Sequence, residues 1–111
     1  MSIQEDKISN LLGLAQRSGK IASGDFAART AVTSGKAACL LVADDASGKA
    51  SSEYSKLAER FGIPFFRVLD KERMGHAIGA DMRAVVTVLD KGFAEAIESL
   101  IPAGEGDAMM R

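Results

Sequence analysis

Apolar residues follow two different spacings along the chain, and the two spacings alternate. The segments 37–43, 65–69 and 84–89 are apolar almost without interruption, which is typical of strands buried on both faces of a sheet. In the segment 7–17 the apolar residues recur every three or four positions, as on a helix with one buried face. They are Ile8, Leu11, Leu12 and Ala15.

Three more helical patterns complete the alternation. They cover 25–34, 51–61 and 91–101, and a very short strand precedes the first of them. Alternating helices and strands predict a three-layer α/β/α sandwich around a small, mixed or mostly parallel central sheet. We expect a single domain over residues 1–102 and a disordered tail at 103–111, whose residues have little to bury.

Glycines and short polar side chains predict where the helices begin and end. Gly19 is expected to end the first helix, and Gly35 to end the second in a left-handed conformation. Ser23 and Asp25 are both candidate N-caps of the second helix, because a side-chain oxygen can accept hydrogen bonds from its free N–H groups. By the same argument Asp70 and Asp90 are candidate caps for a helix after 65–69 and for the last helix.

Several classes of protein are excluded by composition. No stretch approaches the ~20 apolar residues of a membrane span, and the acidic first residues lack a signal-peptide core, so we expect a cytoplasmic protein without a membrane partner. One cysteine, Cys39, and one histidine, His76, predict neither a disulfide nor a metal site, and Cys39 is expected in the core. Dinucleotide and serine-elbow motifs are missing and no acid orients His76, so neither a cofactor nor catalysis is expected.

Charge is unevenly distributed along a chain whose net charge is −1. The segment 7–36 contains five basic residues and one acid, whereas acids outnumber bases in 95–111. The molecule is therefore predicted to present one basic and one acidic face, the alternative being solvated charges without a partner.

The start of the second helix is the strongest candidate for a binding site. Its first N–H groups carry partial positive charge, and small residues let another molecule approach closely, so a phosphate or an acidic group fits there. Lys20, Arg29 and Lys36 add formal charge around it. We expect this helix start to be open to solvent and electropositive.

Asp44 and Asp45 follow the buried strand 37–43, at the end where open α/β sheets usually gather ligands. Two interpretations remain open: the pair forms a turn or caps the next helix, or together with Asp70 it lines a pocket for a small ligand or cation.

Several local strings, in this order, resemble the kink-turn RNA-binding ribosomal protein superfamily, in its archaeal large-subunit seven-Ae and eukaryotic thirty-e group and its bacterial YlxQ-like branch. The similarity covers about residues 7–101. The strings are LLGLAQRSGK at 11–20, SGKA at 34–37, LVADDAS at 41–47, IP at 63–64 and MGHAIG at 74–79.

The resemblance implies an α/β/α sandwich whose second helix enters kinked RNA, supported by the loop before the fourth helix. The contact residues that it implies are Lys20, Gly24, Asp25, Phe26, Arg29, Thr30 and Lys36, and then Lys71, Arg73 and Met74 within 69–74. Kink-turn binders carry Gly-x-Asn-Glu-x-x-Lys at the helix start, and this chain has Phe26 and Ala27 in place of the Asn-Glu pair. Phe26 either stacks on a base or packs in the core.

The resulting functional prediction is a non-enzymatic protein that binds structured, kink-turn-like RNA in connection with the ribosome or translation. The rival prediction is a protein-interaction module that keeps the sandwich and has lost the RNA site, which the missing Asn-Glu pair and the near-neutral charge favour.

Overall fold

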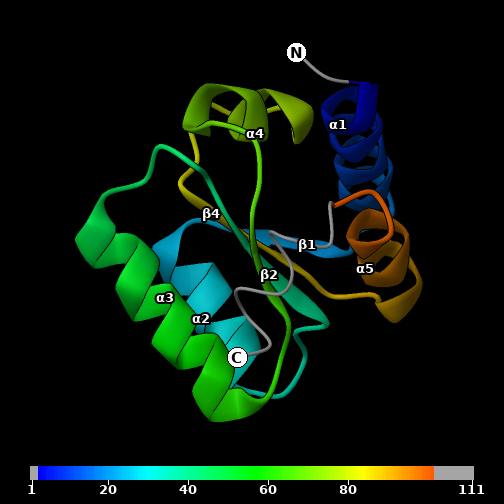
Figure 1. The fold of residues 1–111 in the computed structure, drawn as a ribbon. Helices are drawn as coiled ribbons and strands as arrows, with labels where there is room; N and C mark the ends of the chain where they lie inside the picture. The colour runs from blue at the N-terminus through cyan, green and yellow to red at the C-terminus, as the bar shows by residue number, and fades with distance from the viewer. Residues whose placement is uncertain (1–2, 102–111) are drawn as a thin grey trace.

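A computed structural model describes residues 3–101, and in this range five helices alternate with four strands (Figure 1). The predicted tail at 103–111 and residues 1, 2 and 102 of the predicted domain lie outside the described residues. The elements are α1 (Ile3–Arg17), β1 (Ile21–Ser23), α2 (Asp25–Thr33), β2 (Cys39–Val42), α3 (Gly48–Phe61), β3 (Phe65–Arg67), α4 (Lys71–Ala77), β4 (Val85–Val88) and α5 (Lys91–Glu98).

The four strands form one mixed sheet in the order β1-β4-β2-β3. Only β2 and β3 are parallel, whereas β4 runs antiparallel to both β1 and β2. Ser23 pairs with Val86, and Val42 pairs with both Val85 and Arg67. The last residues of β1, β2 and β3 and the first residue of β4 therefore share one end of the sheet, which we call the α2 end because α2 starts there. The opposite end carries the other terminus of each strand.

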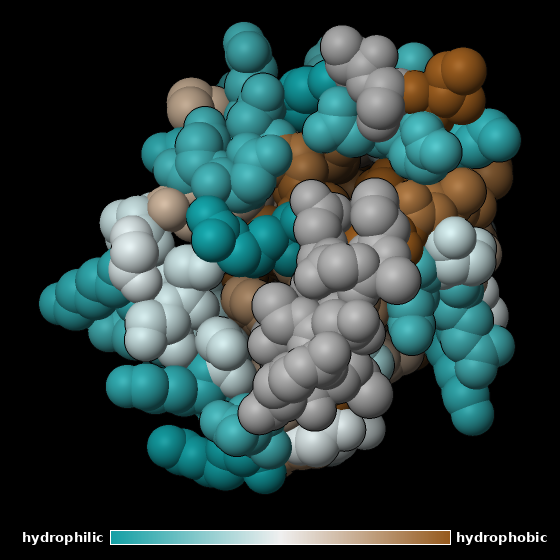
Figure 2. All heavy atoms as spheres, viewed as in Figure 1, coloured by the Kyte–Doolittle hydropathy of each residue, from teal (hydrophilic) through white to brown (hydrophobic). Residues whose placement is uncertain are grey.

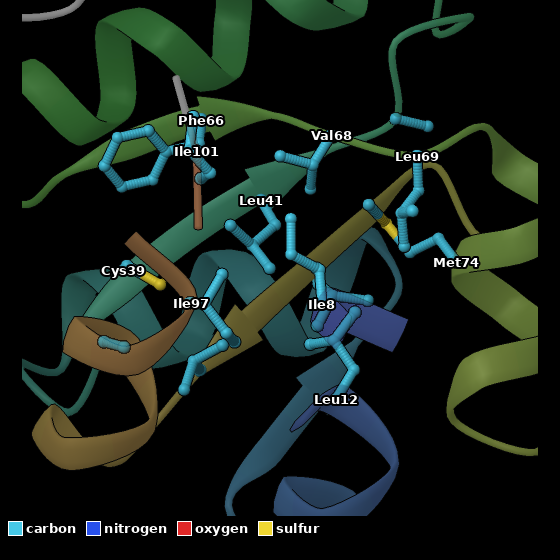
Figure 3. Close-up of a cluster of buried hydrophobic side chains, with 14 of the residues drawn as sticks. Ile8, Leu12, Cys39, Leu41, Phe66, Val68, Leu69, Met74, Ile97 and Ile101 are labelled. Atoms are coloured by element: carbon cyan, nitrogen blue, oxygen red, sulfur yellow. The ribbon is translucent and has the colours of Figure 1, made fainter. Parts of the chain in front are cut away.

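Helices cover both faces of the sheet, so the predicted three-layer α/β/α sandwich is confirmed. On one face, Leu41 and Val86 of the sheet pack with Ile8 and Leu12 of α1 and with residues of α4 and α5 (Figure 3). On the other face, Leu40, Val42 and Val85 pack against α2 and α3. Neighbouring residues of β2 thus enter different cores, which explains why its sequence is apolar without alternation.

Cys39 lies in the first core, as expected, and burial raises the pKa of its thiol to about 12. On the face seen in Figure 2, hydrophobic side chains reach the surface mainly between α4 and α1, while polar and near-neutral side chains cover α3. No helix within residues 3–101 is long and apolar enough to cross a membrane.

Most helix ends lie where capping residues predict them. Gly19 and Gly35 follow α1 and α2 with φ of 72° and 79°, and Asp70 and Asp90 cap α4 and α5 through their side chains. The N-cap prediction for α2 is wrong, because Gly24 occupies that position and neither Ser23 nor Asp25 does. Helix α1 begins four residues earlier than its apolar spacing indicated, since none of the residues 3–6 is buried: Ile3 is exposed and the next three residues are polar.

Candidate nucleic-acid interface

Gly24 positions the start of α2 at the α2 end of the sheet. Its N–H donates to the Val85 carbonyl of β4 (3.1 Å), and its φ of 88° lets the chain turn from β1 directly into the helix. This backbone conformation favours glycine, because a Cβ would strain it. Gly24 has no side chain to cap the helix. The first N–H groups of α2 therefore find no side-chain acceptor on the N-cap residue.

Phe26 lies in the first turn of α2 and is 83% exposed. The core-packing interpretation of this aromatic is therefore wrong. The buried face of α2 consists of Ala28, Ala31 and Val32, and Phe26 lies about 200° around the helix from Ala28. A flat apolar ring thus stands in solvent beside the uncapped helix start, where it is free to contact another molecule.

Arg29 faces the same helix start but is engaged by acidic side chains. Its Nε donates to Asp25 Oδ1 (2.7 Å), its Nη2 donates to Glu53 Oε1 of α3 (3.2 Å), and its guanidinium lies 5.0 Å from the centre of the Tyr54 ring. Two carboxylates therefore face one guanidinium. The expectation of an electropositive helix start is corrected, although the expectation that it is open to solvent is met, because Asp25 and Phe26 are both exposed.

Tyr54 of α3 holds the Asp25 carboxylate in place through a hydrogen bond. Its hydroxyl donates to the same Asp25 oxygen that accepts from Arg29. The hydrogen bonds from Tyr54 and then from Arg29 hold the pKa of Asp25 below its usual range. Burial and the adjacent Asp25 raise the pKa of Tyr54 to about 12, so its hydroxyl remains a donor at neutral pH.

Three loops meet at the α2 end of the sheet and are linked through the backbone. The loop after β2 donates from Asp44 N–H to the Leu69 carbonyl (2.7 Å) and from Ala43 N–H to the Ala84 carbonyl (2.9 Å). The segment before β4 donates from Arg83 N–H to the Lys71 carbonyl (3.1 Å). The loops after β2 and β3 and the segment before β4 therefore form one continuous surface at the α2 end.

The carboxylates after β2 and β3 have structural partners. Asp45 accepts from Lys71 N–H (2.9 Å) and Asp70 accepts from Arg73 N–H (2.8 Å), so both act on the start of α4. Burial, followed by the Asp45 and Asp70 carboxylates, raises the pKa of Asp44. Asp44 and Asp45 therefore lie in a turn, as one interpretation predicted, but they do not cap the next helix, because Ser47 caps α3 and Asp45 bonds to the start of α4 instead. No group of three or more potential metal ligands occurs within residues 3–101.

The second predicted contact region, 69–74, is more buried and makes more contacts within the protein than expected. Leu69 is buried with a φ of 59°, an uncommon left-handed conformation for a residue other than glycine. The prediction for Met74 is wrong, because its side chain is completely buried in the first core and is not available to a ligand (Figure 3).

The two basic residues of this region differ in their contacts. Arg73 lies 3.4 Å from Asp6 and 3.9 Å from Glu5, and so joins α4 to α1. Lys71 is half-buried.

The segment 78–84, between α4 and β4, belongs to the same surface and was missed by sequence reasoning. A Cβ on Gly75 would lie 1.6 Å from the Asp81 carbonyl oxygen, so this segment packs directly onto α4. It presents Met82, which is 58% exposed. An apolar residue between Asp81 and Arg83 in a loop was the available signal, but only the pairing of β4 with β1 brings this loop to the start of α2.

The remaining predicted contacts are distributed along the molecule. Lys20 precedes β1 and its carbonyl accepts from Leu89 N–H, while Lys36 follows the C-terminus of α2. Both are exposed, but both lie toward the opposite end of the sheet, since α2 is nine residues and about 13 Å long. Thr30 is exposed on α2. The structure thus brings together Gly24, Asp25, Phe26 and Arg29, with Lys71 at the same end, and separates them from the two lysines.

Comparison with known proteins gives a consistent picture. "RNA-binding protein YlxQ" of Bacillus subtilis (strain 168) is 32% identical over 91 residues, which cover 82% of this chain and 91% of that protein. The protein of the same name from Enterococcus faecium is 30% identical over 95 residues, covering 86% and 91% respectively.

Two solved structures share the fold. A Bacillus halodurans protein of unknown function, 29% identical, has a TM-score of 0.81 and covers 85% of this chain and 95% of its own. The Giardia lamblia 15.5kD RNA binding protein, 19% identical, has a TM-score of 0.78 and covers 98% of this chain and 92% of its own. A family model matches residues 6–98. The resemblance inferred from the sequence is confirmed, and the chain belongs to the Ribosomal protein L7Ae/L30e/S12e/Gadd45 family.

Proposed function

We propose that this protein binds structured RNA at the α2 end of its sheet and acts without catalysing a reaction. Membership of the family and the names of two similar bacterial proteins support an RNA ligand. The observation that carries the proposal is the exposure of Phe26, on the first turn of a helix that has no capping side chain. Single exposed apolar residues are common on protein surfaces, so the argument rests on the position of this ring beside the helix start as well as on its exposure.

The chemistry of this surface fits a base that is not stacked inside a duplex. Proteins recognise RNA in loops, bulges and bends by stacking extruded bases on aromatic rings. Phe26 offers such a ring, and the exposed Met82 lies on the neighbouring segment before β4. A polarisable thioether is suited to contact with a flat ring. Phe26 would therefore stack on an extruded base, and Met82 offers a further apolar side chain at the same end of the sheet.

The mode of recognition differs from that of kink-turn binders with an Asn-Glu pair. Phe26 and Ala27 offer no side-chain hydrogen bonds to base edges, so the sequence of paired bases is read weakly at these positions. A bent RNA with an extruded base is the ligand class that this surface suits. A role in translation or on ribosomal RNA, in the cytoplasm, follows as part of the same proposal.

An electrophoretic shift experiment tests this function. The probes are a kink-turn RNA and an uninterrupted duplex of the same length, each at a low and a high salt concentration. We expect the kink-turn RNA to bind more tightly, and Phe26→Ala to weaken that binding by about 1–3 kcal/mol, the usual contribution of one stacked base. Equal affinity for both RNAs at both salt concentrations would refute recognition of a bent shape.

Phe61→Ala is the matched control for Phe26→Ala. Phe61 is also exposed, but it is the last residue of α3 and precedes β3, so it lies toward the opposite end of the sheet. Its loss should leave RNA affinity unchanged. If both phenylalanine variants weaken binding equally, the α2 end is not the binding surface.

One observation favours the rival function, a protein-interaction module. The carboxylates of Asp25 and Glu53 outnumber the guanidinium of Arg29 beside the helix start, and exposed Phe26 and Met82 suit an apolar protein contact as well. A pull-down from a nuclease-treated lysate distinguishes the two functions. A protein that remains bound to the wild type and is lost from Phe26→Ala would support the rival.

A further inference from the structure

Arg29 lies three residues after Phe26 on α2, on a neighbouring part of the helix surface, yet three residues already engage it. Its Nε is 2.7 Å from Asp25 Oδ1, its Nη2 is 3.2 Å from Glu53 Oε1, and the Tyr54 ring lies beneath its guanidinium. An arginine that contacts RNA phosphate uses the same donors. The internal carboxylates therefore occupy the positions that phosphate oxygens would take.

We propose that Asp25 and Glu53 are built-in competitors for Arg29, and that RNA binds by exchanging a phosphate for these carboxylates. The inference rests on the proposed RNA-binding function and concerns how that function is restrained. A phosphate placed near Arg29 must displace Asp25, so RNAs that only offer backbone phosphates bind weakly. An RNA that also stacks a base on Phe26 gains the extra free energy needed for the exchange.

The exchange is feasible because the network is solvent-exposed. The side chains of Arg29, Asp25 and Glu53 are 37%, 63% and 49% exposed. Ion pairs in such positions contribute at most about 1 kcal/mol, which one charge-assisted contact with phosphate can replace. Tyr54 is buried, so its ring continues to support the guanidinium after the carboxylates have moved away.

Asp25 is the stronger of the two competitors. It lies closer to Arg29 than Glu53 does, and the Tyr54 hydroxyl donates to the same carboxylate oxygen. Asp25 is also in the first turn of α2, where the partial positive charge of the helix stabilises a carboxylate. Its negative charge therefore repels phosphate from the helix start as well as pairing with Arg29.

The test compares the RNA affinity of wild type and Asp25→Asn over a series of salt concentrations, with a kink-turn RNA as the probe. Asparagine keeps the size of the side chain and removes its charge. We expect Asp25→Asn to bind about two- to fivefold more tightly, the range that corresponds to an exposed ion pair. The logarithm of its affinity should fall more steeply with the logarithm of salt concentration, by about one additional phosphate contact.

Glu95→Gln is the matched control, because it makes the same change in net charge at an exposed i,i+4 pair on α5, where Glu95 lies 4.0 Å from Lys91. A second comparison repeats Asp25→Asn in an Arg29→Ala background. If Asp25 acts chiefly by holding Arg29, most of the gain in affinity is lost in this background, and only the part due to repulsion of phosphate from the helix start remains. Circular dichroism confirms that each variant is folded.

The outcomes separate this inference from the proposed function. If wild type binds the RNA and Asp25→Asn binds no more tightly, the competition is refuted while RNA binding stands. An equal gain in Glu95→Gln, or an undiminished gain without Arg29, also refutes it. Binding by Asp25→Asn alone would support it strongly, whereas no binding by either protein would reject both the inference and the function.

Discussion

The two regions expected to contact RNA are built in opposite ways. The start of α2 has a glycine at its N-cap, an exposed phenylalanine in its first turn and an ion-pair network open to solvent. The region before α4 has a side-chain cap from Asp70, a buried Leu69 and a buried Met74. The first region is therefore available to a ligand, and the second holds the surrounding loops in place. Equal sequence resemblance in two regions does not imply equal roles.

The largest difference between the regions should appear on truncating their methionines. Met74→Ala removes a completely buried side chain from the first core and should lower the free energy of unfolding by about 2–5 kcal/mol. Met82→Ala, in the exposed segment before β4, should change stability by less than about 0.5 kcal/mol. Urea denaturation of both variants measures this. Similar losses would mean that Met82 is packed and not available for binding.

A smaller effect is expected at the helix caps. Asp70→Ala and Asp90→Ala each remove a side-chain bond to the first turn of a helix, from Arg73 N–H and Phe93 N–H respectively, and each should cost about 1 kcal/mol of stability. Only Asp70→Ala should also weaken RNA binding, because Lys71 and Arg83 connect its loop to the segment before β4. Thermal unfolding and electrophoretic shift measure the two effects. Unchanged RNA affinity in Asp70→Ala would remove the second region from the interface.

The network at the start of α2 predicts a weak pH dependence. Because the pKa of Asp25 is lowered on folding, its interactions contribute stability above the ordinary aspartate pKa of about 3.9 and lose it as the pH falls through the lowered value. Wild type should therefore be slightly more stable than Asp25→Asn at neutral pH, and the difference should vanish in acid. Chemical denaturation of both proteins across this pH range measures it. A difference that persists in acid would mean that the charge of Asp25 does not stabilise the fold.

The smallest effect on stability is expected for Phe26→Ala, which should change the free energy of unfolding by less than about 0.5 kcal/mol because the ring is exposed. The same variant should lose RNA affinity, so binding and stability are separated at this position. A clear loss of stability would show that Phe26 packs against the protein in solution, and the contrast between the two regions would fail there.

Much of the fold followed from local sequence signals. Gly19 and Gly35 end helices because each adopts a left-handed conformation, and Asp70 and Asp90 cap helices because their carboxylates reach the N–H group three residues along the chain. These interactions join residues that are close in sequence. For this reason the order of elements was predictable, and only their exact bounds differed.

The position of the candidate site was predictable from the sequence, but the predicted environment of several of its residues was wrong. Local patterns indicated a helix start near Gly24, but the sequence does not show which side of the helix faces the sheet, and so stacking on a base and packing in the core both remained open for Phe26. Arg29 was expected to be an available cation, and Glu53 engages it from 24 residues away. Met74 was expected at the surface, and the packing of α4 against the first core buries it.

The amino-acid sequence by itself determined the alternation of helices and strands, the buried character of the strands and the family to which the chain belongs, because these depend on spacing and short-range contacts. Only the tertiary structure decided which charged groups meet. The antiparallel pairing of β4 with β1 brings the segment before β4 to the start of α2, and the packing of α3 beside α2 brings Glu53 and Tyr54 to Arg29. These contacts join distant parts of the chain, and so the strand register and the packing of helices fix the charge and exposure of the candidate interface.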